Sequence, residues 1–281
     1  MTRDLVHPGP TAPRRVAELA CHAHPLLLRL RAGMPLDAAV AEAFAAEGFA
    51  AGYLRLCDVA MARLDFVCPA PAPGHGPVAW YSATARLAPA RVEAAGLHLG
   101  TRDGAPFLHG HGLWRGADGV PRAGHLLGPD CRLAEDVWAE GWGLSGAALE
   151  AAPDDETGFT LFAPRPAPKR PGGVPAVLCT LRPNVEPLSA LAAVAARHGL
   201  GSARIEGLGS LVGAAFAAEA GIGDVAAELL VLRGAVSAGA ARLEAVAVGF
   251  DGGPVRGALQ AGVNRVCVTC EMLLLAEPGG A

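Results

Sequence analysis

The alternation of hydrophobic and polar positions divides the chain into short predicted elements. Residues 26–31, four of which are leucines, predict a buried strand. From Pro35 to Phe44 the apolar positions follow helical spacing, and Gly48 is a typical end for that helix. Beyond the helix, the pattern predicts a proline-rich loop at 69–77 and strands at 53–57, 62–67, 78–84, 92–100 and 158–162.

The best-patterned segment is a predicted β-hairpin that contains three histidines. Asp118-Gly119 is a turn signal between two apolar runs. Because side chains two apart on a strand share a face, His109 and His111 point the same way. With the turn centred on Asp118, His111 lies directly opposite His125, and His109 lies one diagonal step away. We therefore expect the three imidazoles to converge on one face of two paired strands.

Three histidines on a rigid frame, with a fourth position left for water, are typical of catalytic rather than structural zinc. The sequence therefore predicts that His109, His111 and His125 bind a divalent metal ion, most simply zinc. The alternative is that they are ordinary strand side chains, although three on one face would crowd one another and be poorly solvated. Gly110 and Gly112 occupy the opposite face, where glycine indicates close packing of another element.

The same segment resembles a known family. It reads G-T-R-D-G-x-P-F-x-H-x-H-x-x-W over residues 100–114 and D-G-x-x-x-x-G-H-L-L over residues 118–127. This is similar to the histidine hairpin of the plant-and-prokaryote-conserved (PPC) domain, and the resemblance covers most of 26–164. It implies an antiparallel sheet flanked by helices, homotrimeric assembly and, often, a metal held by the histidines. For plant members it also implies an Arg-Gly-Arg-Pro hook that binds DNA.

The order of elements begins again in the second half of the chain, as expected for an internal repeat. A strand at 177–183 restates the first strand, and a helix from 187 to a glycine stop at 199 restates the first helix. Further strands are predicted at 205–211 and 228–237.

The hairpin also recurs, but without its histidines. Residues 251–257 align with 118–124 without a gap, at an offset of 133. With the same offset, each histidine of the first hairpin corresponds to another residue type in the second: Arg242 for His109, Glu244 for His111 and Ala258 for His125. If the histidines served packing alone, the second copy would be expected to retain at least one, so their loss favours a role beyond structure.

These patterns predict an α+β protein with two PPC-like units, each an antiparallel β-sheet flanked by helices. We expect a flexible N-terminal tail at 1–24 and a first unit with the histidine site at 25–164. A proline-rich linker at 165–175 then leads to a second unit at 176–281, which lacks the site.

Composition agrees with a folded protein. The 281 residues suffice for two domains, and 52% hydrophobic against 18% charged residues favours buried cores over disorder. Seven scattered cysteines argue against a disulfide scaffold and indicate a reducing, cytoplasmic compartment. The N-terminal residues lack the order of a signal peptide, and no apolar run is long enough for a membrane helix.

Further residues near the hairpin are candidates for the same site. His98 precedes it on the neighbouring strand, where lining the pocket is possible but a role other than ligand is favoured. Asp103 is a candidate partner for a ligand imidazole, and Arg102 for a substrate carboxylate or phosphate. Glu135 and Asp136 are candidates for a fourth ligand or a general base.

Two other groups of residues can be explained either by a functional role or by ordinary packing in the core. Trp114, Trp138 and Trp142 cluster in sequence around the site and could wall a pocket, although core packing explains them equally well. Cys267 and Cys270 form a C-x-x-C, but positions three apart on a strand face opposite sides. Buried strand residues are therefore the better interpretation of these cysteines.

The favoured function is a metal-dependent enzyme acting on a small molecule, possible reactions being hydrolysis or a lyase reaction. The alternatives are a DNA-binding or regulatory protein and a purely structural, metal-stabilised oligomer. The resemblance implies self-association, as a trimer. The net charge of -4 and the missing basic hook weigh against DNA, and no membrane partner is expected.

Duplex DNA is expected not to bind tightly, because so acidic a chain can neutralise few phosphates. A fluorescence-anisotropy titration at two salt concentrations measures this. Submicromolar binding at physiological salt that weakens steeply as salt rises would contradict the prediction.

Overall fold

The computed structural model describes residues 4–74 and 76–277, and it corrects the predicted fold class. Strands make up 56% of the chain and helices 9%, so the protein is mostly β rather than α+β. In the part of the chain that is described, neither α-helix is long and apolar enough to span a membrane.

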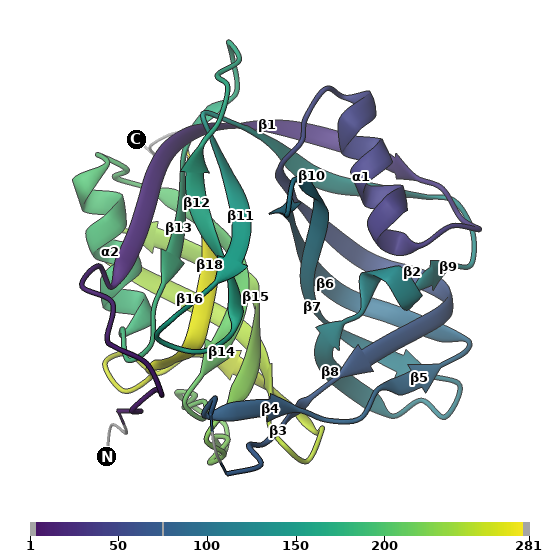
Figure 1. Ribbon diagram of the computed structural model, residues 1–281. Helices are drawn as coiled ribbons and strands as arrows, with labels where there is room; N and C mark the ends of the chain where they lie inside the picture. Colours follow the sequence, from purple (N-terminus) through teal and green to yellow (C-terminus); the bar gives the residue numbers. More distant parts are fainter. Residues whose placement is uncertain (1–3, 75, 278–281) are drawn as a thin grey trace.

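The first half of the chain consists mainly of strands, with one α-helix near its start (Figure 1). Its elements are β1 (Val16–Leu30), α1 (Leu36–Ala46), β2 (Gly52–Val67), β3 (Pro69–Pro71), β4 (Ala79–Tyr81), β5 (Ala85–Leu87), β6 (Ala90–Arg102), β7 (Ala105–Gly116), β8 (Pro121–Leu126), the 3-10 turn η1 (Gly128–Asp130), β9 (Arg132–Leu133), β10 (Val137–Ser145), β11 (Ala147–Pro153) and β12 (Thr160–Pro166).

The second half begins in the same way, with a strand and then a helix. Its elements are β13 (Val174–Leu181), α2 (Pro187–Arg197), β14 (Ala203–Leu211), β15 (Ala227–Ser237), β16 (Ala240–Val248), β17 (Pro254–Ala258) and β18 (Val266–Ala276). The helices begin next to Pro35 and at Pro187 as predicted. Gly48 and Gly199, beyond their ends, have positive φ values of +77° and +68°, which confirms both as helix stops.

One continuous sheet of sixteen strands joins the halves, in place of the two separate helix-flanked sheets that were predicted. The cause is β1, which pairs with β10 through residues 22–30 and with β13 through residues 16–23. In Figure 1 this strand runs from the α2 side of the molecule to the α1 side. The sheet is mixed, because β11 pairs with β6 in parallel.

The same pairing corrects the predicted tail and linker. Residues 16–24 belong to β1 and are not a flexible tail. The predicted linker at 165–175 is partly strand, since β12 extends to Pro166 and β13 begins at Val174. Strand β1 is long enough to hydrogen-bond on both sides, which orders its first residues.

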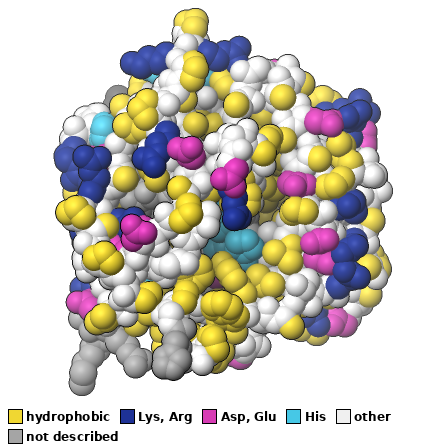
Figure 2. All heavy atoms as spheres, viewed as in Figure 1, with side chains coloured by type: hydrophobic (Ala, Val, Ile, Leu, Met, Phe, Trp, Pro, Cys, Tyr) yellow, Lys and Arg dark blue, Asp and Glu magenta, His cyan; other side chains and the backbone are white. Residues whose placement is uncertain are grey.

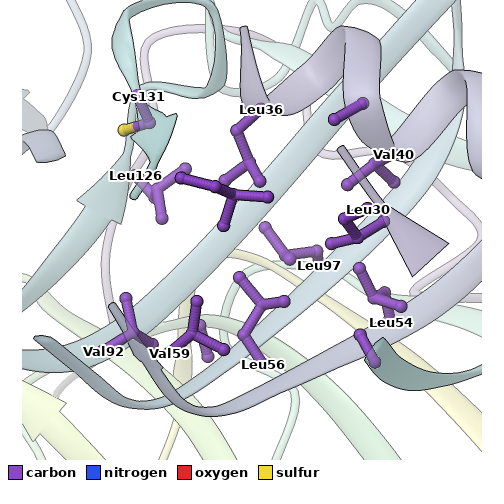
Figure 3. Packing of buried hydrophobic residues seen from close by; sticks show 14 of the residues in the cluster. Leu30, Leu36, Val40, Leu54, Leu56, Val59, Val92, Leu97, Leu126 and Cys131 are labelled. Atoms are coloured by element: carbon purple, nitrogen blue, oxygen red, sulfur yellow. The ribbon is translucent and has the colours of Figure 1, made fainter. Parts of the chain in front are cut away.

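The core of the first half lies inside a closed loop of strands. β2 continues through both of the strands predicted at 53–57 and 62–67, and it pairs with β6 near its start and with β8 near its end. Side chains of α1 such as Leu36 and Val40 pack against Leu30, Leu54 and Leu97 in this interior (Figure 3).

A similar core lies under α2 in the second half, where Leu188, Leu191 and Val194 are buried. A third apolar cluster combines the two halves, with Tyr53 and Leu149 from the first and Leu273 from the second. Apolar side chains of the two halves are therefore buried against each other.

Asp65 is a buried carboxylate on β2, and its charge is held by two arginines. Its Oδ2 is 2.8 Å from Nη2 of Arg63 and 2.8 Å from Nη2 of Arg86. Hydrogen bonds from Arg63 and then Arg86 lower the pKa of Asp65 well below its usual range.

Because the folded-state pKa of Asp65 is depressed, its stabilisation is present above the unfolded pKa of about 4 and is lost as pH falls below it. We expect Asp65→Asn to lower the free energy of unfolding at neutral pH by about 1–3 kcal/mol, and to flatten its decline in acid. Asp136→Asn, which removes an exposed partner of Arg29, is the control and should cost less. Equal losses in urea titrations of the two variants would contradict this role of Asp65.

Candidate metal centre

The predicted histidine hairpin is confirmed in its register. It is formed by β7 and β8, in which His111 pairs directly with His125. Gly119 in the turn has a φ of +71°, a conformation that favours glycine. His109 also lies on β7, two residues from His111, so strand alternation puts all three side chains on one face.

The three imidazoles converge. One ring nitrogen from each of His109, His111 and His125 lies within 4.8 Å of the others. The Nε2 atoms of His109 and His111 are 3.2 Å apart. His111 is buried, and the other two are half-buried. Behind them, the missing side chains of Gly110 and Gly112 leave room for Leu97 and Trp114.

The second half of the chain covers the face that bears the histidines. Glu271 on β18 places its Oε2 atom 3.4 Å from Nδ1 of His109. Glu228 on β15 places its Oε1 atom 3.7 Å from Nε2 of His111 and 3.9 Å from Nδ1 of His125. Both carboxyl groups are buried, so the cluster combines side chains from both halves.

The backbone of β15 fixes the orientation of His111. Its Nδ1–H donates to the carbonyl oxygen of Leu229 at 3.0 Å. Because a carbonyl oxygen can only accept, Nδ1 has the proton in the neutral ring and Nε2 keeps its lone pair. This lone pair faces His109 and Glu228. Metal-binding imidazoles are commonly oriented by such a bond from the opposite nitrogen.

Burial favours the neutral form of His111 and His125. It lowers the pKa of His111 well below the usual value, and the nearby charges of His109 and His125 lower it further. Burial, together with His109, lowers the pKa of His125 to about 3. Neutral imidazole is the form that binds metal. Burial has the opposite effect on Glu228, whose carboxyl pKa it raises well above the usual range.

Four buried atoms in or beside the cluster have no hydrogen-bond partner among the described residues, namely Nδ1 of His125 and of His98, and Oε2 of Glu228 and of Glu271. An unsatisfied buried polar atom costs about 1–3 kcal/mol. A cation between the imidazoles would engage Nδ1 of His125 and attract both carboxyl groups. These residues therefore fit a divalent metal, and the nitrogen-rich donor set suits zinc.

A cavity of about 110 Å³ opens beside the cluster. Figure 2 shows histidine side chains at the floor of a hollow in this face, with hydrophobic side chains beside them. Trp80 and Tyr81 on β4 line the cavity, although sequence analysis did not single them out. β4 pairs with β3 in a small separate sheet, within and just beyond the predicted proline-rich loop.

Glu228 and Glu271 also escaped sequence analysis, although a signal was present. Each is an acidic residue in an otherwise apolar strand, in the segments A-A-E-L-L-V and T-C-E-M-L-L. Such a residue is either exposed or, if it is buried, expected to have a partner or ligand, because burial of an unpaired carboxylate is costly.

His98 lies next to the cluster but outside the metal-binding group. It pairs with His109 across β6 and β7, and it is fully buried. Its Nε2–H donates to the backbone oxygen of Glu271 at 3.1 Å. Burial lowers the pKa of His98 to about 4, so it is a neutral positioning residue between the two halves.

The other four candidates do not line the cavity as the structure describes it. Asp103 is 93% exposed in the β6–β7 turn, and Arg102 lies beside it with its guanidinium 5.7 Å from the ring centre of Phe107. Glu135 and Asp136 are exposed, and Asp136 bonds to Arg29. Arg102 is the last residue of β6 and the other three lie in turns or loops between strands, where their side chains reach solvent.

Of the tryptophans near the hairpin in sequence, none lines the cavity. Trp114 is a core residue, Trp138 is 64% exposed and Trp142 is buried against Tyr53. Their proximity in sequence did not predict proximity in space, because Trp114 lies on the opposite face of the hairpin from the histidines. Cys267 and Cys270 are buried in different apolar clusters, which agrees with their interpretation as strand residues.

The second hairpin has the register that the alignment implies, since Glu244 pairs with Ala258 as His111 pairs with His125. Glu244 instead forms an ion pair with Arg256 at 3.2 Å, on an exposed part of the sheet. Within residues 4–74 and 76–277, the histidine trio is the one group of metal-type ligands found close together.

No protein-family model and no curated protein matches this chain. Among solved structures it is similar to a metal-containing protein from Archaeoglobus fulgidus, with 24% identity over 50% of this chain and 94% of that one, and a TM-score of 0.41. A PPC protein from Pyrococcus horikoshii is 17% identical over 51% of this chain and 94% of its own, with a TM-score of 0.40. A candidate DNA-binding protein from Ralstonia eutropha JMP134 is 15% identical over 49% and 89%, with a TM-score of 0.39.

Glu228→Gln is expected to stabilise the metal-free protein. Because burial raises the pKa of Glu228, folding is penalised once pH exceeds the unfolded value of about 4.5, and the amide removes that penalty. We expect a gain of about 1 kcal/mol in the free energy of unfolding at pH 8, measured in urea with a chelator.

The matched control is Glu156→Gln. Burial raises the pKa of Glu156, but hydrogen bonds from Arg15 and Arg182 lower it more, so this buried carboxyl is paired. Its replacement should destabilise the protein. A loss of stability in Glu228→Gln as large as that in the control would show that Glu228 is satisfied in the fold.

Proposed function

We propose that this protein binds one divalent metal ion, zinc, through His109, His111 and His125, and acts on a small molecule in the adjoining cavity. The observation that supports this most directly is the convergence of three imidazole nitrogens within 4.8 Å, beside buried carboxyl atoms that have no partner in the described part of the chain. When bound, such a metal lowers the pKa of a water molecule or polarises a carbonyl group, as hydrolases and lyases require.

The protein's own residues have distinct roles in this proposal. Leu229 fixes the ring of His111 through its carbonyl oxygen, so that Nε2 faces the centre. Glu271 lies beside Nδ1 of His109 and can hold a proton there when Nε2 is engaged. The aromatic side chains of Trp80 and Tyr81 limit the access of water.

Glu228 is the proposed base. Its Oε2 atom is buried at the cavity, in reach of a group bound there, and it has no partner among the residues that the structure describes. Burial raises the pKa of this carboxyl, which makes it a better proton acceptor than an ordinary glutamate. Perturbed acids of this kind beside a cavity are typical of functional sites.

We also propose that the two halves are PPC-like units and that the second lost its metal site while retaining the hairpin. The equal register of the two hairpins supports this. In this proposal the second half still contributes Glu228 and Glu271 to the site.

His111→Ala should abolish metal binding while leaving secondary structure near that of the unmodified protein, because the equivalent hairpin folds with Glu244 at this position. We expect roughly one zinc ion per chain, and none in the variant, by elemental analysis after purification. A chelator should lower the Tm of the unmodified protein by several degrees and that of His111→Ala by none.

Glu244→Ala is the matched control, since Glu244 has the same place in the second hairpin. It should retain full metal content. If His111→Ala and Glu244→Ala bind the same amount of metal, the assignment of the site is wrong.

A further inference from the structure

The cavity beside the metal cluster has aromatic walls. Five aromatic side chains line it, from β4, β7, β12 and the residue just before β12: Trp80, Tyr81, Phe107, Phe159 and Phe162. The rings of Phe107 and Phe162 lie 5.5 Å apart, and that of Tyr81 lies 5.3 Å from His125. A flat apolar group is favoured between such rings, since aromatic pairs contribute about 0.5–1.5 kcal/mol beyond the area they bury.

Apart from the proposed metal, the cavity offers no permanent positive charge to an anionic ligand. Among the described lining residues there is no lysine or arginine, and the acidic ones are Glu228 and Glu271. Arg102 lies over Phe107 but does not itself line the cavity. Sites that bind carboxylates or phosphates usually supply arginine, lysine or a helix N-terminus.

Two buried carboxyl oxygens at the cavity are acceptors that a ligand could satisfy. Oε2 of Glu228 and of Glu271 are buried without a partner among the described residues. The Oγ atom of Ser210 already accepts from the backbone of Val268 at 3.0 Å. A ligand that brings N–H or O–H groups would satisfy these oxygens, whereas one with acceptors alone would leave them unpaired.

We propose that the cavity binds a small uncharged molecule that combines an aromatic or other flat apolar body with an N–H or O–H donor group, as in a primary carboxamide. The body lies between the aromatic side chains, and the donor group faces Glu228 and Glu271. An amine also suits carboxyl and aromatic groups, but it would bring a second cation next to the metal. The inference rests on the proposed function, because the exclusion of amines depends on the bound metal, whereas the aromatic body and the donor group follow from the lining of the cavity.

Three probes with the same ring separate these classes: benzamide, benzoate and benzylamine. Their affinities are measured by isothermal titration calorimetry on the zinc-loaded protein at pH 7.5. We expect benzamide to bind about tenfold more tightly than either of the other two probes, which corresponds to about 1.4 kcal/mol. Equal or tighter binding of benzoate or benzylamine would overturn the ligand class, as would the absence of binding by all three.

Trp80→Ala tests the location. Trp80 is 49% exposed, so its loss leaves the core intact, and we expect it to weaken benzamide binding about tenfold without changing the zinc content. Trp138→Ala is the matched control, because Trp138 is an exposed tryptophan outside the cavity. Equal benzamide affinities for the two variants would place the ligand elsewhere and overturn the proposal.

The same titrations of the metal-free protein separate this inference from the proposed function. A preference for benzamide that persists in a protein unable to bind zinc supports the ligand class while the metal proposal fails. Full zinc binding together with a preference for benzoate overturns the ligand class and leaves the metal proposal standing.

Discussion

The histidine hairpin presents its imidazoles on the outer face of the first half, and the rest of the site depends on how that face is buried. Leu113 and Ala123 of the hairpin pack against Leu208, Leu230 and Val246 of the second half. This apolar contact removes His111 and His125 from water, and burial lowers the pKa of both imidazoles, which favours their neutral form. Without the second half, the same three histidines would lie together on a solvated face of the hairpin.

The same burial makes the two carboxyl groups unusual. Glu228 and Glu271 lie in apolar strands that cover the hairpin, and neither Oε2 atom has a partner among the described residues. A fold selected for stability alone would place apolar residues at such positions, because buried carboxylates are costly. Their presence next to His109 and His111 is therefore best explained by a ligand or metal that engages them.

Strand β1 ensures that the two halves meet in one arrangement. It hydrogen-bonds to β10 on one side and to β13 on the other, so the sheets of both halves are continuous. The buried ion pair of Arg55 with Glu206 adds a polar contact between the halves, with Nε and Oε2 3.4 Å apart. Backbone pairing and side-chain contacts together set the distance between the histidines and the carboxyl groups.

The sequence by itself determined the local features: both helices, the hairpin register and the convergence of His109, His111 and His125. These follow from periods of two and 3.6 residues and from a turn of fixed length, which act within a few residues. The single mixed sheet, the ordering of residues 16–24 and the contribution of Glu228 and Glu271 were decided only in the tertiary structure. They depend on which strands pair across more than a hundred residues of chain, and hydrophobic periodicity within a segment does not specify the partner of its outer face.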